Sequence, residues 1–356
     1  MGDRERVVLE AHKLFPDAPI YTAVCDTEAM TAFAQCDVRT TYLQEKLPKF
    51  LHTKPELWAV LRTAAFRNLE LDEYDIILSI TEAEAKAVRK TRPNQTHIAY
   101  VHAVSQYWSR EATFKSMISS SLLGFALRPI LRPLLRKLYE RDLESIQGID
   151  VFIANSSITQ ARIKQYYDRS STVIHPPVDI DRFTPPPQTE RDGYILWGRH
   201  VPYKRFDLAI QACNNLLRPL TIIGSGPDTD RLKALAGPLV EFTGRISDEE
   251  LVTRAQHAQA FLFPNEEDFG ISAVEALAAG TPVIGYAKGG VLDIVQDGET
   301  GVLFEHQTVE DLMAAIERAE TLSFLPATLH RKSKRFATSL FDQKLRKIIA
   351  DHLASS

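Results

Sequence analysis

Short runs of apolar residues alternate with amphipathic stretches along nearly the whole chain. This alternation is typical of βαβ units built around a parallel sheet, so it predicts an α/β protein. A helix is predicted at Glu5–Phe15, where apolar residues recur on one face. The strands predicted in the first half are Ile20–Cys25, Asp75–Ile80, His97–His102, Val151–Asn155 and Thr172–His175. The strands predicted in the second half are Tyr194–Trp197, Leu220–Ile223, Val240–Thr243, Ala260–Phe263, Val283–Tyr286 and Val302–Phe304.

A proline-rich stretch divides the chain. The segment HPPVDIDRFTPPP ends at Pro187 and reads as an extended, stiff linker, because proline breaks helices and cannot donate to a sheet. The pattern predicts a first domain at 1–180 and a second at 181–335. The last segment, 336–356, is predicted to be helical and is free to cross back to the first domain.

The composition is that of a globular protein, with 44% hydrophobic and 25% charged residues. A net charge of −4 gives no basic surface for nucleic acid. Three separate cysteines form no C-x-x-C pair, so we expect neither a disulfide scaffold nor a metal site, and a reducing cytoplasm fits. No apolar run reaches the ~20 residues that a membrane span needs, and the charged N-terminus has no signal-peptide core.

The stretch FPNEEDFGISAVEALAAGTPVIGYAKGG carries the first candidate chemistry. A strand ends at Pro264, and Gly270 opens a helix that stops at Gly280. Glu267 therefore lies in the loop and Glu275 lies in the helix, so both carboxylates can face the crevice beyond the strand ends. A helix start suits phosphate and carboxylates suit sugar hydroxyls, which together suggest a nucleotide sugar. A solvated acidic loop before a buried helix is the structural alternative.

Two cations follow an earlier strand, in the sequence LWGRHVPYKR. Arg199 lies in the loop after the strand, and Lys204 stands where the next helix begins. At the carboxyl edge of the same sheet they could neutralise a diphosphate leaving group. By themselves, an arginine and a lysine at this spacing usually mark a solvated surface.

A set of ordered motifs now becomes recognisable: GRHVPYK, IIGSGPD, FTGRISDEEL, EEDFGISAVEALAAGTPVI and KGGVLDIVQDGETGVLF. In this order they resemble the donor domain of retaining glycosyltransferase family 4, and the nearest likeness is to bacterial mannosyltransferases of O-antigen and exopolysaccharide assembly. The resemblance implies the GT-B fold, which is α/β with two Rossmann-like domains facing across a cleft. It covers nearly the whole chain, and the motifs of the second half are highly specific.

The resemblance also implies roles for matching residues. Arg199 and Lys204 would hold the donor diphosphate, Glu267 would contact the transferred hexose, and Glu275 would bind the ribose hydroxyls. His102 would face the donor sugar from a strand end of the first domain. The implied catalytic residues are His102, Arg199, Lys204 and Glu267. The implied donor-binding residues are Gly198, Arg199, Lys204, Gly224, Gly226, Arg245, Ile246, Glu267, Asp268, Phe269, Gly270, Ile271 and Glu275.

Relatives of this kind transfer a sugar with retention of configuration and without a divalent metal. The resemblance therefore implies no metal and no cofactor, with GDP-mannose as the favoured donor and a glycan or polyprenyl-linked saccharide as the acceptor. Asp179-Ile180-Asp181 matches a metal-binding D-x-D pattern, but it lies in the proline-rich linker. A non-catalytic nucleotide-sugar-binding protein and a nucleotide-sugar epimerase on the same fold are the alternative functions.

Two further features bear on the first domain. Met117–Arg141 combines regularly spaced arginines with leucines, which suits peripheral contact with an anionic membrane, although Pro129 and Pro133 interrupt it and an inter-domain helix fits equally. In the family, a first strand and a glycine-rich loop precede a helix like Glu5–Phe15. We therefore expect the first strand to be missing here, which would leave neighbouring strands with unpaired backbone groups or a gap.

Overall fold

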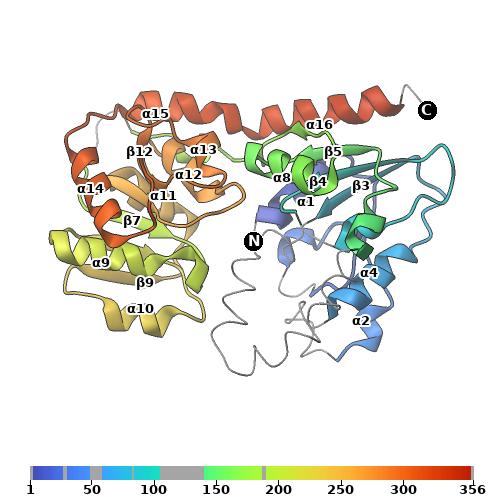
Figure 1. Cartoon of the computed structure of the whole chain (residues 1–356), viewed down its shortest axis with the longest axis horizontal. Helices are drawn as coiled ribbons and strands as arrows, with labels where there is room; N and C mark the ends of the chain where they lie inside the picture. The colour runs from blue at the N-terminus through green and yellow to red at the C-terminus, as the bar shows by residue number, and fades with distance from the viewer. Residues whose placement is uncertain are drawn as a thin grey trace. The chain divides into compact units, whose positions relative to one another are not determined.

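The computed structural model describes residues 3–26, 30–48, 58–81, 84–104, 140–186 and 190–353 (Figure 1). The chain divides into two compact units. One unit comprises Met1–His175 together with Asp342–Ser356, and the other comprises Pro176–Phe341. The division falls inside a single helix, α16, which spans Thr338–Leu353, so the end of the chain belongs to the first unit. Most of Met117–Arg141 lies outside the described residues.

The first unit contains two parallel sheets. Four strands form one sheet in the order β3-β4-β5-β6, and two strands form a separate sheet, β1-β2. The bounds are β1 Ile20–Thr22, β2 Val38–Thr40, β3 Ile76–Thr81, β4 Thr96–Val101, β5 Val151–Ala154 and β6 Thr172–Val173. The helices of this unit include α1 Asp3–Leu14, α2 Leu43–Lys46, α4 Ala59–Arg67 and α8 Ser157–Tyr167.

The second unit is built on one parallel sheet of six strands in the order β12-β11-β10-β7-β8-β9. The bounds are β7 Tyr194–Trp197, β8 Leu220–Ile223, β9 Val240–Gly244, β10 Ala260–Phe263, β11 Val283–Tyr286 and β12 Gly301–Phe304. The helices are α9 Phe206–Leu216, α10 Thr229–Leu235, α11 Asp248–His257, α12 Ile271–Ala278, α13 Val291–Ile294, α14 Val309–Glu320 and α15 Pro326–Ser333. The strand order reverses between β7 and β10, which makes this a doubly wound sheet.

Burial explains why the second unit was the easier half to predict. Every residue of β7, β10 and β11 is buried, because helices cover both faces of a parallel sheet. Strands of this kind read as continuous apolar runs, and the bounds predicted for these three strands are those observed. Hydroxyl side chains cap two of the surrounding helices, since Ser247 accepts from the Glu250 N–H and Thr308 accepts from the Asp311 N–H.

The prediction was less complete in the first unit. Strand β2 was missed, because two of its three residues are exposed and it lacks an apolar run. Strand β1 ends at Thr22, earlier than the predicted Cys25. Among the described residues, no helix is both long and apolar enough to cross a bilayer.

Candidate functional site

The candidate site lies at the carboxyl edge of the second sheet, where the strand order reverses. Loops that follow β7 and β10 leave the sheet on either side of this point. In open α/β sheets, ligands bind in the crevice outside the strand ends at such a position. The motif with the candidate cations follows β7, and the motif with the candidate carboxylates follows β10.

Glycines allow the loops to touch through their backbones. Gly224, after β8, has φ +117°, and a Cβ at this position would come within 2.1 Å of the Gly198 carbonyl oxygen. Gly289, in the loop after β11, has φ +82°, and a Cβ there would meet the Glu267 carbonyl oxygen at 2.2 Å. The Gly290 N–H donates to that same oxygen over 2.8 Å. The backbone of the acidic loop is therefore fixed by its neighbour.

Lys204 and Glu267 meet as an ion pair between the two loops. The Lys204 Nζ contacts Glu267 Oε1, and both side chains are mostly buried, with 17% and 15% exposed. Asn265, itself 2% exposed, donates from Nδ2 to the same Glu267 oxygen over 2.8 Å. One carboxylate oxygen is thus held by a cation and a neutral donor. Sequence reasoning missed the role of Asn265.

Glu275 is held by a different donor. Gly270, with φ +106°, precedes α12, and Glu275 lies inside that helix with 4% of its surface exposed. The indole Nε1 of Trp197, at the end of β7, donates to Glu275 Oε2 over 3.2 Å. The Trp197 ring also packs on Phe261, with ring centroids 4.2 Å apart. A buried tryptophan needs a partner for its N–H, and this was the signal that could have revealed the contact.

The remaining predicted donor-binding residues follow the ends of the same strands. Arg199 and Arg245 are exposed, in the loops after β7 and β9 respectively. Ile246 packs partly against the core, and Phe269 and Ile271 are buried around the start of α12. Gly198, Gly224 and Gly226 form the backbone turns of the β7 and β8 loops, where Gly226 approaches His200 so closely that a Cβ would lie 2.2 Å from its carbonyl oxygen. Asp268 lies in the acidic loop before Gly270.

His102 belongs to the first unit, at the end of β4. Its N–H donates to the Thr81 carbonyl over 2.8 Å, and its own carbonyl accepts from Asn155 Nδ2 over 2.9 Å. The side chain is 4% exposed, and its Nε2 is buried with no hydrogen-bond partner among the described residues. Burial, with a smaller effect from the charge of Arg4, lowers the pKa of His102 to about 3. The imidazole is therefore neutral near pH 7.

His200 is a further buried histidine that sequence reasoning did not single out. Its Nδ1 lies 2.9 Å from Thr229 Oγ1, and its ring meets Phe206 edge-on. It fixes the β7 loop against α10. In the described part of the chain, no group of three or more His, Cys, Asp or Glu side chains is placed to hold a metal ion.

Residues 177–336 match the family model described as glycosyl transferases group 1. The second unit therefore matches a group 1 glycosyltransferase domain over nearly its whole length.

Curated relatives match a little over half of the chain. The chain is 29% identical over 225 residues to a GDP-mannose-dependent alpha-(1-6)-phosphatidylinositol monomannoside mannosyltransferase of Mycobacterium tuberculosis, covering 54% of this chain and 57% of the relative. It is 32% identical over 230 residues to a D-inositol 3-phosphate glycosyltransferase of Mycolicibacterium smegmatis, covering 58% and 52%. The chain thus spans about half the length of the curated relatives it matches.

Solved structures share the fold over a greater length. HepE of Anabaena, in complex with UDP, aligns with a TM-score of 0.72 at 17% identity over 99% of this chain and 96% of its own. Sucrose-phosphate synthase from Thermosynechococcus elongatus aligns with a TM-score of 0.69 at 19% identity, covering 90% and 84%. These likenesses establish the GT-B architecture.

The buried histidines predict a loss of stability in acid. Burial lowers the pKa of His97 to about 4 and that of His102 to about 3. Below pH ~6.5 these two side chains are therefore protonated in the unfolded state but remain neutral in the folded state. The free energy of unfolding should therefore fall as pH drops from about 6.5 to about 4, by up to ~1.4 kcal/mol per pH unit for each histidine.

Amide exchange of β4 between pH 7.5 and 5 measures how steeply the free energy of unfolding of the first unit changes with pH. His102→Asn should remove about half of the histidine-dependent slope, and His97→Gln should remove a similar part. An unchanged slope in both variants would show that neither side chain is buried as a neutral ring.

Proposed function

We propose that the chain transfers a hexose from a nucleotide sugar to a glycan or lipid-linked saccharide, retaining the anomeric configuration without a metal ion. The proposal is carried by one observation: two contacts, that of Lys204 with Glu267 and that of Trp197 with Glu275, join the elements that follow β7 and β10, where the strand order of the second sheet reverses. A cation beside one carboxylate, and a second buried carboxylate near the next strand end, match the charge and hydroxyl pattern of a nucleoside diphosphate sugar.

Each charged residue then has a distinct task. Lys204 and Arg199 bind the diphosphate and stabilise the negative charge that grows on it as the glycosidic bond breaks. Glu267 accepts hydrogen bonds from hydroxyls of the transferred hexose. Glu275, oriented by Trp197, accepts hydrogen bonds from the two ribose hydroxyls.

His102 contributes a neutral ring to the proposed reaction. Because its pKa is about 3, the imidazole is neutral near pH 7 and keeps one N–H, so it acts through hydrogen bonding and not as a general acid. We assign it a contact with the donor sugar. The acceptor hydroxyl attacks from the face of the departing diphosphate, which takes up the proton of that hydroxyl and thereby makes a separate general base unnecessary.

GDP-mannose is the donor we propose first. The name of the M. tuberculosis relative specifies GDP-mannose, whereas HepE was solved with UDP, so the two nucleotides are the alternatives to compare. Thermal-shift titration of the full chain with GDP-mannose, GDP, UDP-glucose and UDP tests the assignment. We expect the largest rise in melting temperature with GDP-mannose, and no rise with any of the four would contradict a donor site.

Lys204→Ala should abolish most of the turnover while the fold persists. Loss of one charge at the leaving group is expected to lower kcat about 10²- to 10³-fold, measured as release of GDP from GDP-mannose. The matched control is Lys233→Ala, which removes an exposed lysine from α10 of the same unit. Wild-type turnover in Lys204→Ala would refute the assignment, whereas nucleotide binding without turnover in the wild type would indicate a binding protein.

Trp197→Phe should weaken nucleotide binding without slowing the chemical step. The substitution removes the indole N–H that holds Glu275 but keeps an aromatic ring against Phe261. Loss of one hydrogen bond to a carboxylate should raise the Kd for GDP about 5- to 10-fold in calorimetry, with little change in kcat. Trp58→Phe makes the same chemical change in the first unit and should leave the Kd unaltered. Equal Kd values for GDP in the two variants would contradict the role of Trp197 in positioning Glu275.

A further inference from the structure

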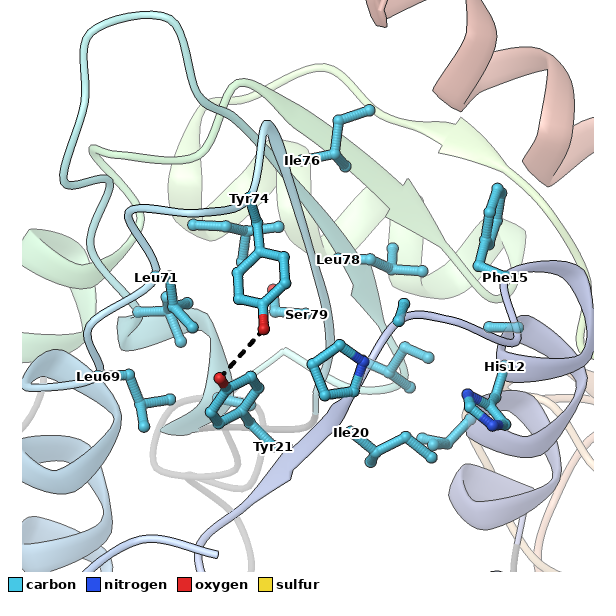
Figure 2. Close-up of a pocket in the computed structure, with 18 of the residues that line it drawn as sticks. His12, Phe15, Ile20, Tyr21, Leu69, Leu71, Tyr74, Ile76, Leu78 and Ser79 are labelled. Carbon is cyan, nitrogen blue, oxygen red and sulfur yellow. Dashed lines mark hydrogen bonds between the residues drawn. The ribbon is translucent and has the colours of Figure 1, made fainter. Parts of the chain in front are cut away.

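Four histidines in the described part of the chain bury one ring nitrogen without a hydrogen-bond partner: His12, His97, His102 and His200. His12 lies on the wall of a mainly apolar cavity of about 510 Å³ in the first unit (Figure 2). Ser79 belongs to the same wall, and its Oγ lies 2.9 Å from Nε2 of His97. Of the four, His200 alone belongs to the second unit, where it lies in the loop after β7.

The backbone of His200 is anchored to the loop after β8 on both sides. Its N–H donates to the Ser225 carbonyl over 3.2 Å, and its carbonyl accepts from the Asp228 N–H over 3.1 Å. A Cβ at Gly226 would come within 2.2 Å of the same carbonyl oxygen. The two loops therefore pack too closely for a side chain at that glycine.

The side chain of His200 adds a third link between these loops. Its Nδ1 lies 2.9 Å from Oγ1 of Thr229, at the start of α10. That hydroxyl accepts from the Gly226 N–H over 3.0 Å and gives its single hydrogen to the Gly226 carbonyl over 2.8 Å. No hydrogen of the hydroxyl is left for the ring, so the ring Nδ1 is the donor in this contact.

Aromatic side chains surround the imidazole, which is 0% exposed. Its ring meets Phe206 and Phe242 edge-on, with centroids 5.3 and 6.0 Å apart. Burial lowers the pKa of His200, and the charge of Asp228 opposes this shift only in part. The ring is therefore neutral near pH 7 and contributes a hydrogen bond to the loop without adding a charge.

Arg199 stands between two residues that are held to the loop after β8. On one side, the Gly198 N–H donates to the Ile223 carbonyl over 3.1 Å, and Gly224 packs against the Gly198 carbonyl. On the other side, His200 is held by its three links. Arg199 itself is exposed. Its backbone is thus fixed by its neighbours, whereas its guanidinium stays accessible to a ligand.

We propose that His200 is a positioning residue for the donor diphosphate: its bond to Thr229 ties the β7 loop to the β8 loop and thereby sets the position of Arg199. The proposal rests on the proposed function, in which Arg199 binds that diphosphate. A loop that is already ordered loses less conformational freedom when the ligand binds. Loss of the bond should therefore weaken binding of a nucleoside diphosphate more than that of the monophosphate, which offers Arg199 one phosphate fewer.

Calorimetry of the full chain with GDP and GMP, and with UDP and UMP, tests the proposal on whichever base the wild type binds. His200→Leu removes the ring donor, and Thr229→Val removes the hydroxyl while keeping its shape. Each should raise the Kd for the diphosphate about 5- to 10-fold and that for the monophosphate less than about twofold. Because both substitutions remove the same bond, the double variant should bind the diphosphate about as weakly as either single variant.

Further variants separate positioning from folding. His200→Asn and Thr229→Ser keep a donor and a hydroxyl, and they should restore most of the preference for the diphosphate. Arg199→Ala should lower that preference, and His200→Leu added to it should lower the preference no further, because the arginine that it positions is gone. The matched control is His257→Leu, at the exposed end of α11, where Nδ1 lies 2.7 Å from the Thr253 carbonyl. It should change neither Kd.

Several results would overturn the proposal. Equal losses of diphosphate and monophosphate affinity in His200→Leu would show that the histidine only supports the fold. An additional loss of preference in the Arg199→Ala background would show that it acts through another group. Should His200→Leu fail to fold, Thr229→Val must show the selective loss by itself. A wild type that binds none of the four nucleotides would overturn the proposed function as well, whereas an unchanged preference in His200→Leu would overturn the role of His200 alone.

Discussion

Backbone-to-backbone packing of loops at the carboxyl edge of the second sheet is the constraint on which the candidate site depends. The loops after β7 and β8 touch at Gly198 and Gly224, and the loops after β10 and β11 touch at Glu267 and Gly289. Any side chain at Gly224 or Gly289 would occupy the space of a neighbouring carbonyl group. The loops therefore hold one another in place, and they support the functional side chains on a rigid backbone.

On this frame, each of the two glutamates has its own orienting donor. Asn265 fixes Glu267, and Trp197 fixes Glu275. Both donors are neutral and buried, so they direct the carboxylates without neutralising them. Lys204 compensates the charge of Glu267, in the loop that we propose binds the diphosphate. Orientation and electrostatics are thus supplied by different residues.

The sequence predicted the second unit better than the first for a physical reason. Strands buried on both faces, such as β10 and β11, appear as uninterrupted apolar runs with clear ends. The polar strand β2 carries no such signal. The motifs located Lys204 and Glu267 in the correct loops, but the contacts of Trp197 and Asn265 depend on how loops from separate strands pack. The spacing of residues along the sequence does not show which loops pack together in the folded chain.

The ion pair between Lys204 and Glu267 has a consequence for selectivity. Inorganic phosphate that approaches the lysine would have to separate it from the glutamate and would leave that carboxylate without compensation in a mostly buried place. A donor molecule that brings an anion for the lysine and hydroxyl groups for the glutamate satisfies both at once. In the ion pair each charge offsets the other, which would disfavour the binding of the small anions that are abundant in any cell.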